Sequence, residues 1–272
     1  MSPHDPKVSI ITICRNAVDE IGSTMGSVLG QSYSAIEYLI IDGGSTDGTV
    51  EQINRHAKPA VKWISEPDRG IYDAMNKGVR LATADWTIFM NAGDRFYAPD
   101  SLSQLLARPI SEADVVYGDH EVRYGEDFSR IQHARGIETL WKGMICSHQA
   151  MICRTQLLRE HPFGDGSLAE DFSFLMHLKA CDRRFEYRPV VVASVAAGGL
   201  SDTRRAEFLR DRLRTVTRYE SGFAVHAYYA GLIAQNQLIQ VVRKGIPRHA
   251  WRWLLASKYG LAKVSKAKSG RK

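Results

Sequence analysis

The sequence has few cysteines, and their spacing matches no cross-linking or metal-binding pattern. Cys14, Cys146, Cys153 and Cys181 lie far apart, form no C-x-x-C pair and have no histidines at the spacing of a zinc site. This spacing excludes a zinc knuckle and a disulfide framework. We therefore expect a reducing, cytoplasmic environment.

Long apolar runs are also missing. No stretch of about 18 uninterrupted apolar residues occurs, so a conventional membrane-spanning helix is not expected. The first residues, MSPHDPK, lack the apolar segment of a signal peptide. If the protein meets a membrane, we expect it to bind from the cytoplasmic side, as a peripheral protein on the inner face of the cytoplasmic membrane.

Acidic residues are absent from the C-terminal part of the chain. The formal net charge is +6, but the last 52 residues hold 10 Lys or Arg and no Asp or Glu. The first 220 residues carry 26 basic and 30 acidic side chains. The body of the protein thus lacks the positive surface that follows a phosphate backbone, and we expect no nucleic-acid partner.

What the sequence does contain is an alternation of short β-branched runs and helical segments. From residue 7 to about residue 120 the pattern predicts strands at 8–13, 36–42, 61–66 and 86–90, separated by helices at 18–31, 49–57 and 71–84. Near-continuous apolar strands alternating with helices are typical of a parallel sheet covered on both faces. We predict an α/β, Rossmann-like nucleotide-binding half.

The second half of the chain alternates less regularly. It predicts strands at 114–124 and 185–196 and helices at 155–160 and 169–180, followed by an apolar but polar-interrupted helix at 223–242. This order is typical of an α+β arrangement that ends in a helical extension.

Two predicted strands end in acidic side chains, where open α/β sheets bind ligands. Asp42 ends the strand 36–42 and can accept a hydrogen bond from a base, and Thr46 or Asp47 can cap the next helix. The glycines after Asp42 do not form G-x-G-x-x-G, so a mononucleotide is favoured over a dinucleotide. Asp94 follows the strand 86–90 in the turn FMNAGD, and its alternative role is to cap the helix after 98–100, for which Asp100 is better placed.

Five motifs together resemble one known family. They are VSIITICRN, IIDGGSTDGT, SEPDRGIYDAMNKG, FMNAGDRF and AEDF, in this order. Their order and spacing resemble the GT-A glycosyltransferases of family 2, in the version found in the branch that builds bacterial surface polysaccharides and glycolipids. The resemblance covers residues 7 to about 201.

The resemblance implies a GT-A catalytic domain over residues 1–205, with a nucleotide-binding half at about 7–120 and an acceptor half at about 121–205. A helical, basic C-terminal extension would occupy 206–272. The implied donor is a nucleotide-diphosphate sugar, and the implied acceptor is a saccharide or a lipid-linked molecule.

The same resemblance assigns the donor contacts residue by residue. They are Ile13, Arg15, Asp42, Asp68, Arg69, Asp73 and Asn91. Arg69 offers a fork of donors for phosphate oxygens, although a surface pair with Asp68 is the alternative. Arg15 stands where the family often has Tyr, and its guanidinium could stack on a base, which leaves the base open.

Asp94 matches the metal-binding acid of the family. The family usually has Asp-x-Asp or Asp-Asp here, whereas this sequence has Asn91-Ala92-Gly93-Asp94. One carboxylate with diphosphate oxygens and waters is adequate for Mg²⁺ or Mn²⁺. We expect a divalent cation, bound weakly when the donor is absent.

Asp171 matches the second acid of the family's ED motif, the general base that takes the proton of the attacking hydroxyl. Its alternative role is to stabilise a helix dipole with Glu170. We expect partial burial to raise the pKa of Asp171. Glu170 and His148 are candidate contacts for the acceptor or a phosphate, and a structural role is the alternative for His148.

The basic tail predicts a further helix at 248–264, with Arg248, Arg252 and Lys263 on one side and Trp253 on the other. Such a helix could lie in an anionic membrane interface. Packing against the catalytic domain is the alternative.

The sequence thus favours an inverting, metal-dependent glycosyltransferase that acts in cell-surface polysaccharide or glycolipid synthesis. Two alternatives stay open. A catalytically inactive sugar-nucleotide-binding or scaffolding subunit would explain the missing metal acid, and a sugar-1-phosphate nucleotidyltransferase would share the nucleotide-binding fold.

Overall fold

The computed structural model describes residues 6–57, 61–125, 128–199 and 203–245. Its strands are β1 Val8–Cys14, β2 Ile36–Asp42, β3 Val61–Ser65, β4 Trp86–Phe89, β5 Arg95–Phe96, β6 Val115–Arg123, β7 Ser129–Gln132, β8 Met151–Arg154 and β9 Phe185–Ala196. Its helices are α1 Ile21–Leu29, α2 Thr49–His56, α3 Ile71–Leu81, α4 Ser101–Leu105, α5 Thr155–Glu160, α6 Glu170–Ala180, α8 Arg205–Tyr219 and α9 Phe223–Gly245, with short 3₁₀ helices η1 Ile137–Lys142 and η2 His148–Ala150.

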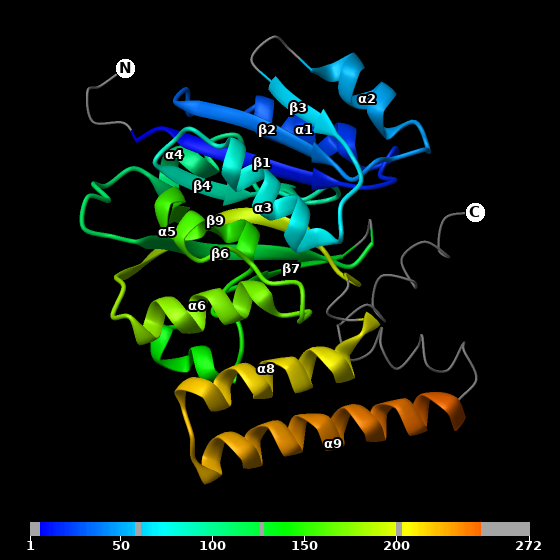
Figure 1. Ribbon diagram of the computed structural model, residues 1–272, viewed down its shortest axis with the longest axis vertical. Helices are drawn as coiled ribbons and strands as arrows, with labels where there is room; N and C mark the ends of the chain where they lie inside the picture. The colour runs from blue at the N-terminus through cyan, green and yellow to red at the C-terminus, as the bar shows by residue number, and fades with distance from the viewer. Residues whose placement is uncertain (1–5, 58–60, 126–127, 200–202, 246–272) are drawn as a thin grey trace, which may run out of the picture.

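The nine strands of the described residues form one curled sheet in the order β3-β2-β1-β4-β8-β6-β9-β5, with β7 paired to β6 (Figure 1). The first four strands of this order are parallel. The remaining strands pair in mixed directions, because β8 is antiparallel to both β4 and β6 while β9 is parallel to β6. The predicted α/β class is confirmed, and the only run of four neighbouring parallel strands in the described residues is β3-β2-β1-β4.

The apolar side chains of the parallel strands fall on both faces of the sheet. Ile10 and Ile40 pack with α1, α2 and α4 on one face, while Ile11 and Ile41 pack with α3, α5 and α6 on the other. Successive residues of a strand point to opposite faces, so an unbroken apolar run such as VSIITIC fits a strand that is buried on both sides. The two layers leave the carboxyl ends of β1 to β4 together at one edge.

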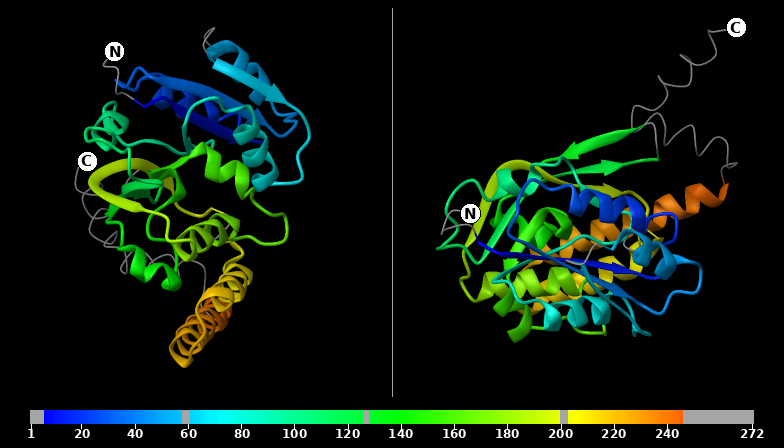
Figure 2. Two further views of the ribbon diagram at one scale, coloured as in Figure 1. Left: turned by 60° about the vertical axis from the view of Figure 1, so that its left-hand side comes forward. Right: turned by 90° about the horizontal axis from the view of Figure 1, so that it is seen from above.

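The helices α8 and α9 form an antiparallel pair below the sheet and the helices that cover it (Figures 1 and 2). The helix α8 packs against α6, and α9 packs against α8 and η1. In the described part of the chain no helix has the length and apolarity needed to cross a bilayer. The helix predicted at 248–264 lies outside the described residues.

Most predicted elements occur within a few residues of their expected bounds. The first helix is the main exception, because it begins at Ile21 rather than at residue 18. The caps differ as well. Asp47 accepts a hydrogen bond from the backbone N–H of Thr49 at 3.0 Å, whereas the carboxylate of Asp100 makes no cap and accepts from Gln104 Nε2 at 2.7 Å.

Candidate active site

Asp42 lies at the carboxyl end of β2, in register with Cys14 and Ser65 of the neighbouring strands. It is fully buried, and its oxygens accept hydrogen bonds from Ser45 Oγ at 2.5 Å and Ser65 Oγ at 2.6 Å. Burial raises the pKa of Asp42, but these hydrogen bonds outweigh it and lower the pKa overall. The carboxylate therefore shapes the loop, and direct contact with a base stays a prediction that requires one serine to turn away.

Side chains of α3 hydrogen-bond the backbone of the loop that follows β3. Asp73 accepts from the backbone N–H of Arg69 at 3.1 Å, and Lys77 Nζ donates to the carbonyl of Pro67 at 2.7 Å. The Arg69 side chain is 75% exposed, and it pairs with Asp73 at 3.4 Å and with Asp165 at 3.8 Å. The alternative of an Asp68–Arg69 pair is thus not what forms, because Asp68 instead accepts from the backbone N–H of Gly70 at 2.9 Å.

Arg15 and Ile13 flank the same edge of the sheet in different ways. Arg15 is exposed, and its Cβ lies 3.4 Å from the position a Cβ would take on Gly43. Ile13 is buried in the core, and its carbonyl accepts from the backbone N–H of Ala92 at 3.0 Å. The exposed Arg15 side chain can contact a ligand, whereas Ile13 holds the turn after β4 through its backbone and does not face the solvent.

Asp94 sits in the turn after β4 and is anchored at both oxygens. The backbone N–H of Ala196 donates to Oδ1 at 3.0 Å, and Gln149 Nε2 donates to Oδ2 at 2.5 Å. Burial raises the pKa of Asp94 above its ordinary value, against the lowering effect of these bonds and of nearby His148 and Arg123. Asp94 does not cap α4, so the alternative considered for it is wrong.

Asp171 is the second residue of α6 and accepts a hydrogen bond from the hydroxyl of Tyr72 at 3.2 Å. Its side chain is 17% exposed, and Oδ2 lies 3.5 Å from Nδ1 of His148. Burial raises the pKa of Asp171, but the hydrogen bond and charge of His148 prevail and lower the pKa overall. The expectation that the pKa of Asp171 would be raised is therefore wrong, because the approach of His148 could not be read from the sequence.

The short helix η2 connects the two acids. His148 faces Asp171, and the next residue, Gln149, holds Asp94. Asn91 Nδ2 lies 3.1 Å from His148 Nε2. With Asn91 as the donor, Nε2 accepts and the ring proton is on Nδ1, towards Asp171. The carboxyls of Asp94 and Asp171 thus contact two consecutive residues of η2, and the charge of His148 acts on both.

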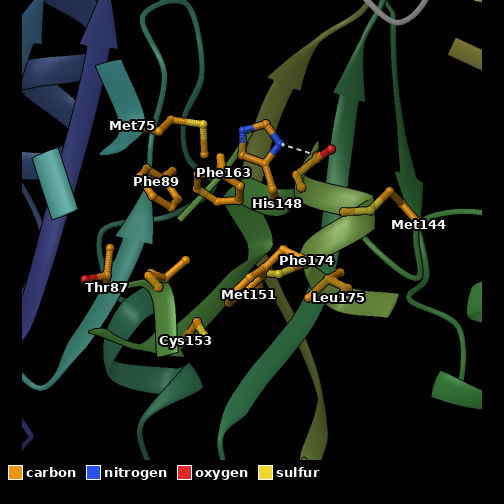
Figure 3. A pocket seen from close by; sticks show the side chains of 12 residues that line it. Met75, Thr87, Phe89, Met144, His148, Met151, Cys153, Phe163, Phe174 and Leu175 are labelled. Carbon is orange, nitrogen blue, oxygen red and sulfur yellow. Dashed lines mark ion pairs between the residues drawn. The ribbon is translucent and has the colours of Figure 1, made fainter. Parts of the chain in front are cut away.

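The base end of the site borders an apolar cavity of about 20 Å³. Figure 3 shows the His148 ring, with its ion pair dashed, above the side chains of Phe163, Met151 and Phe174. Such surroundings exclude water and strengthen charge interactions at Asp171. Glu170, one residue earlier, turns away and accepts from the backbone N–H of Gly164 at 3.2 Å, and burial raises the pKa of its carboxyl.

Three side chains that contact the candidate site were not singled out from the sequence. Gln149 follows His148 and binds Asp94, and Arg123 lies in β6 and donates to the carbonyl of Gly93 at 2.5 Å. The Tyr72 hydroxyl contacts Leu168, Glu170 and Asp171, and so links α3 to the start of α6. A signal for Tyr72 did exist, since it shares a helix face with Met75 and Val79, which are buried.

The oxygen atoms at the end of β4 fit a hard cation in part. Asp94 supplies one carboxylate, and Oδ1 of Asn91 is a buried acceptor without a hydrogen-bond partner. Within the described residues no group of three His, Cys, Asp or Glu side chains could hold a metal by itself. This set agrees with a Mg²⁺ or Mn²⁺ ion that takes its remaining ligands from substrate phosphates and water.

A sheet with four parallel strands, continued by strands of mixed direction and covered by helices on both faces, is the GT-A class of α/β fold. The family model for "Glycosyl transferase family 2" matches residues 9–175, more than half of the chain. The chain therefore belongs to glycosyl transferase family 2, and both the fold and the family predicted from the sequence are confirmed.

Similar sequences occur in mycobacteria. An uncharacterized glycosyltransferase of Mycobacterium tuberculosis is 41% identical over 113 residues, which cover 39% of this chain and 43% of that protein. A PGL/p-HBAD biosynthesis glycosyltransferase of Mycobacterium bovis is 34% identical over 163 residues, covering 56% of this chain and 60% of that protein. The chain thus matches only about half the length of these relatives, and the second relative agrees with the predicted branch.

Solved structures share the fold. A mannosyltransferase of Pyrobaculum calidifontis, in complex with GDP-Man and Mn²⁺, superposes with a TM-score of 0.66 at 21% identity, covering 96% of this chain and 81% of that one. TarS of S. aureus in complex with UDP-GlcNAc gives a TM-score of 0.60 at 17% identity, covering 84% and 71%.

Proposed function

We propose that the chain is an inverting, cation-dependent glycosyltransferase that moves a sugar from a nucleotide-diphosphate sugar to a hydroxyl group. The observation that carries the proposal is the juxtaposition of Asp94 and Asp171 through Gln149 and His148. The catalytic domain would be residues 1–205, with halves at about 7–120 and 121–205, and residues 206–272 would be the extension.

On the donor side, Asp94 and Oδ1 of Asn91 would hold a Mg²⁺ or Mn²⁺ ion. Such an ion, when bound, acts as a Lewis acid and a template for the leaving diphosphate. The exposed guanidinium of Arg69 would bind phosphate oxygens, because its fork matches their geometry. Arg15 and the loop around Asp42 and Asp68 would hold the nucleoside. The GDP-Man, Mn²⁺ and UDP-GlcNAc bound by structural neighbours support this class of donor.

On the acceptor side, Asp171 would take the proton of the attacking hydroxyl. Its lowered pKa keeps the carboxylate ionised at neutral pH, and Nδ1–H of His148 orients Oδ2 while Tyr72 orients Oδ1. Attack opposite the leaving diphosphate in a single displacement inverts the anomeric centre. A positioned base of this kind contributes roughly 10²- to 10⁴-fold to the rate.

The test is transfer and donor hydrolysis with purified nucleotide sugars, assayed with Mn²⁺ and with EDTA. The donor is chosen first by the melting-temperature rise that each nucleotide sugar gives with Mn²⁺. We expect EDTA and Asp94→Asn to abolish both the thermal shift and turnover. Asp85→Asn, an exposed acid that directly precedes β4, is the matched control. Full turnover in EDTA would refute the role of the cation.

The acceptor would be a saccharide or a lipid-linked molecule of cell-surface polysaccharide or glycolipid synthesis. The mycobacterial relative named for PGL/p-HBAD biosynthesis supports this class. The basic segment after residue 246 would bind an anionic membrane surface from the cytoplasmic side. A chain lacking residues 247–272 should lose binding to anionic vesicles, and retained binding would refute the membrane role.

The two alternatives give different results in the same assays. An inactive sugar-nucleotide binder would show cation-dependent donor binding by calorimetry without turnover on any acceptor pool, and the departure from Asp-x-Asp at 91–94 is what favours it. A nucleotidyltransferase would release diphosphate from a nucleoside triphosphate.

A further inference from the structure

Arg212 brings a positive charge to the base end of the site from outside residues 9–175, the segment that matches the family model. It lies on α8, and its Cζ sits 4.4 Å from the ring centroid of Phe208 and 5.2 Å from that of Phe172, the residue after Asp171. Aromatic faces stabilise a guanidinium from above and below while leaving its edge free to donate.

The edge of this guanidinium makes no hydrogen bond with the residues that the structure describes. Its Nε atom is buried without any hydrogen bond, and no ion pair reaches Arg212 within the described parts of the chain. The charge of Asp171 acts on Arg212 and favours its protonated form, but burial is the larger effect and lowers the Arg212 pKa. A half-buried guanidinium whose Nε atom is buried without a hydrogen bond is costly to keep charged. A bound anion would offset that cost.

A second guanidinium approaches the same point. A Cβ built on Gly143 would lie 2.6 Å from Arg212 Nη1 and 3.6 Å from Arg135 Nη2, so both cations border this glycine. Gly143 has φ +136°, a conformation that favours glycine. Arg135 is exposed and donates from Nη2 to the carbonyl of Met144 at 2.6 Å. The charge of Arg135 acts against that of Arg212, and an anion bound between two guanidinium groups relieves such repulsion.

We infer that Arg212 and Arg135, with the backbone of Gly143 between them, bind a phosphate group carried by the acceptor. The inference rests on the proposed function, which places the donor diphosphate at Asp94 and the acceptor hydroxyl at Asp171. Arg212 lies at the Asp171 end of the site, and a guanidinium fork matches phosphate oxygens. The phosphate would hold the acceptor with its hydroxyl at the base.

An apolar surface adjoins this Arg212–Arg135 cluster. Trp141 and Tyr228 stack edge to face with ring centroids 5.4 Å apart, and Lys142 lies 5.1 Å from the Trp141 ring centroid. Aromatic rings beside cationic groups suit a ligand whose phosphate carries an apolar chain. The same phosphate site would also accept a water-soluble phosphosugar. Only a lipid-linked phosphate would contact the rings of Trp141 and Tyr228 with its apolar chain.

The test is calorimetric titration of the full chain in EDTA, which removes the cation that a donor diphosphate needs. Inorganic diphosphate is the first probe, and farnesyl diphosphate is the second. We expect Arg212→Met to weaken diphosphate binding by about 10- to 100-fold, the loss of a charge-assisted hydrogen bond or two. The control Arg210→Met, an exposed residue on the same helix, should stay within about twofold.

Arg135→Met provides a second variant that does not alter the core, and it should weaken diphosphate binding in the same direction. A tighter fit of farnesyl diphosphate that is lost in Trp141→Ala would identify a lipid-linked acceptor, and equal affinities would identify a soluble one. Unchanged diphosphate binding in Arg212→Met and Arg135→Met would overturn the inference. So would a shift of the pH–rate profile in Arg212→Met with diphosphate binding intact, because Arg212 would then act only on Asp171.

This experiment is separable from the proposed function. Diphosphate binding is measured without donor or cation, so a chain that binds diphosphate but transfers no sugar would refute the transferase and leave the phosphate site standing. A chain that transfers sugar normally in Arg212→Met, with no loss of acceptor affinity, would do the reverse.

Discussion

Nδ1 of His148 lies 3.5 Å from Oδ2 of Asp171, and this contact sets the charge of the proposed base. It lowers the pKa of Asp171 although burial acts in the opposite direction. Removing the imidazole should therefore raise the pKa of the base. In His148→Gln, the acid limb of the pH–rate profile should move to higher pH. His56→Gln, an exposed histidine on α2, is the control, and an unmoved acid limb in His148→Gln would contradict the pairing.

Replacing the base itself should be far more costly. We expect Asp171→Asn to lower kcat by roughly 10²- to 10⁴-fold, because the amide cannot accept the proton of the attacking hydroxyl. Donor affinity with Mn²⁺ should change little, since the donor is held at the other end of η2. Steady-state kinetics and donor calorimetry check both parts. Transfer at the wild-type rate would remove Asp171 from the mechanism.

Tyr72 positions the start of α6 and so affects both stability and rate. In Tyr72→Phe the backbone N–H of Glu170 loses its acceptor at 3.2 Å and Asp171 loses a donor. We expect the free energy of unfolding to fall by about 1–3 kcal/mol, with a drop in kcat. Urea denaturation measures the first effect. Tyr219→Phe, at the exposed end of α8, should behave as wild type.

Two helical glycines should respond in opposite directions to alanine. A Cβ on Gly78 of α3 would collide with Ile11 Cγ2 beneath it, whereas a Cβ on Gly26 of α1 would meet nothing within 4 Å. We expect Gly78→Ala to destabilise the protein by about 1–3 kcal/mol and Gly26→Ala to stabilise it by about 0.5–1 kcal/mol. Thermal unfolding of both variants decides, and equal shifts would contradict the packing of α3 on the sheet.

Glu37 should make the fold sensitive to acid. Its side chain is 4% exposed and pairs with Lys62 at 2.9 Å. Burial raises its pKa, but hydrogen bonds from Thr83, Ser9 and Lys62 lower it overall, from 4.5 to about 2. The stabilisation, on the order of 3 kcal/mol, is present above pH 4.5 and is lost as the pH falls towards 2. Glu37→Gln should flatten the stability curve in that window, whereas Glu51→Gln, on the exposed face of α2, should not.

The sequence predicted the strands, the family and the two acids, because apolar periodicity and motif order are local properties. It could not predict which side chains surround each acid. Tyr72 lies 99 positions before Asp171, and their contact depends on how α3 meets α6. The sign of the Asp171 pKa shift failed for the same reason, since burial was foreseeable and the approach of His148 was not. Nothing in the sequence singled out Arg212, because its proposed role depends on which groups surround it in the folded protein.

Two consecutive residues of η2 contact the two acids of the site: Gln149 binds Asp94 and His148 pairs with Asp171. If one residue were inserted between these two positions, only one of the two contacts could be kept. The distance between the proposed cation site and the proposed base is therefore fixed by the backbone of η2. To accept a bulkier sugar, a redesigned protein would need smaller side chains around the site, because the distance between Asp94 and Asp171 cannot be increased without losing one of the two contacts.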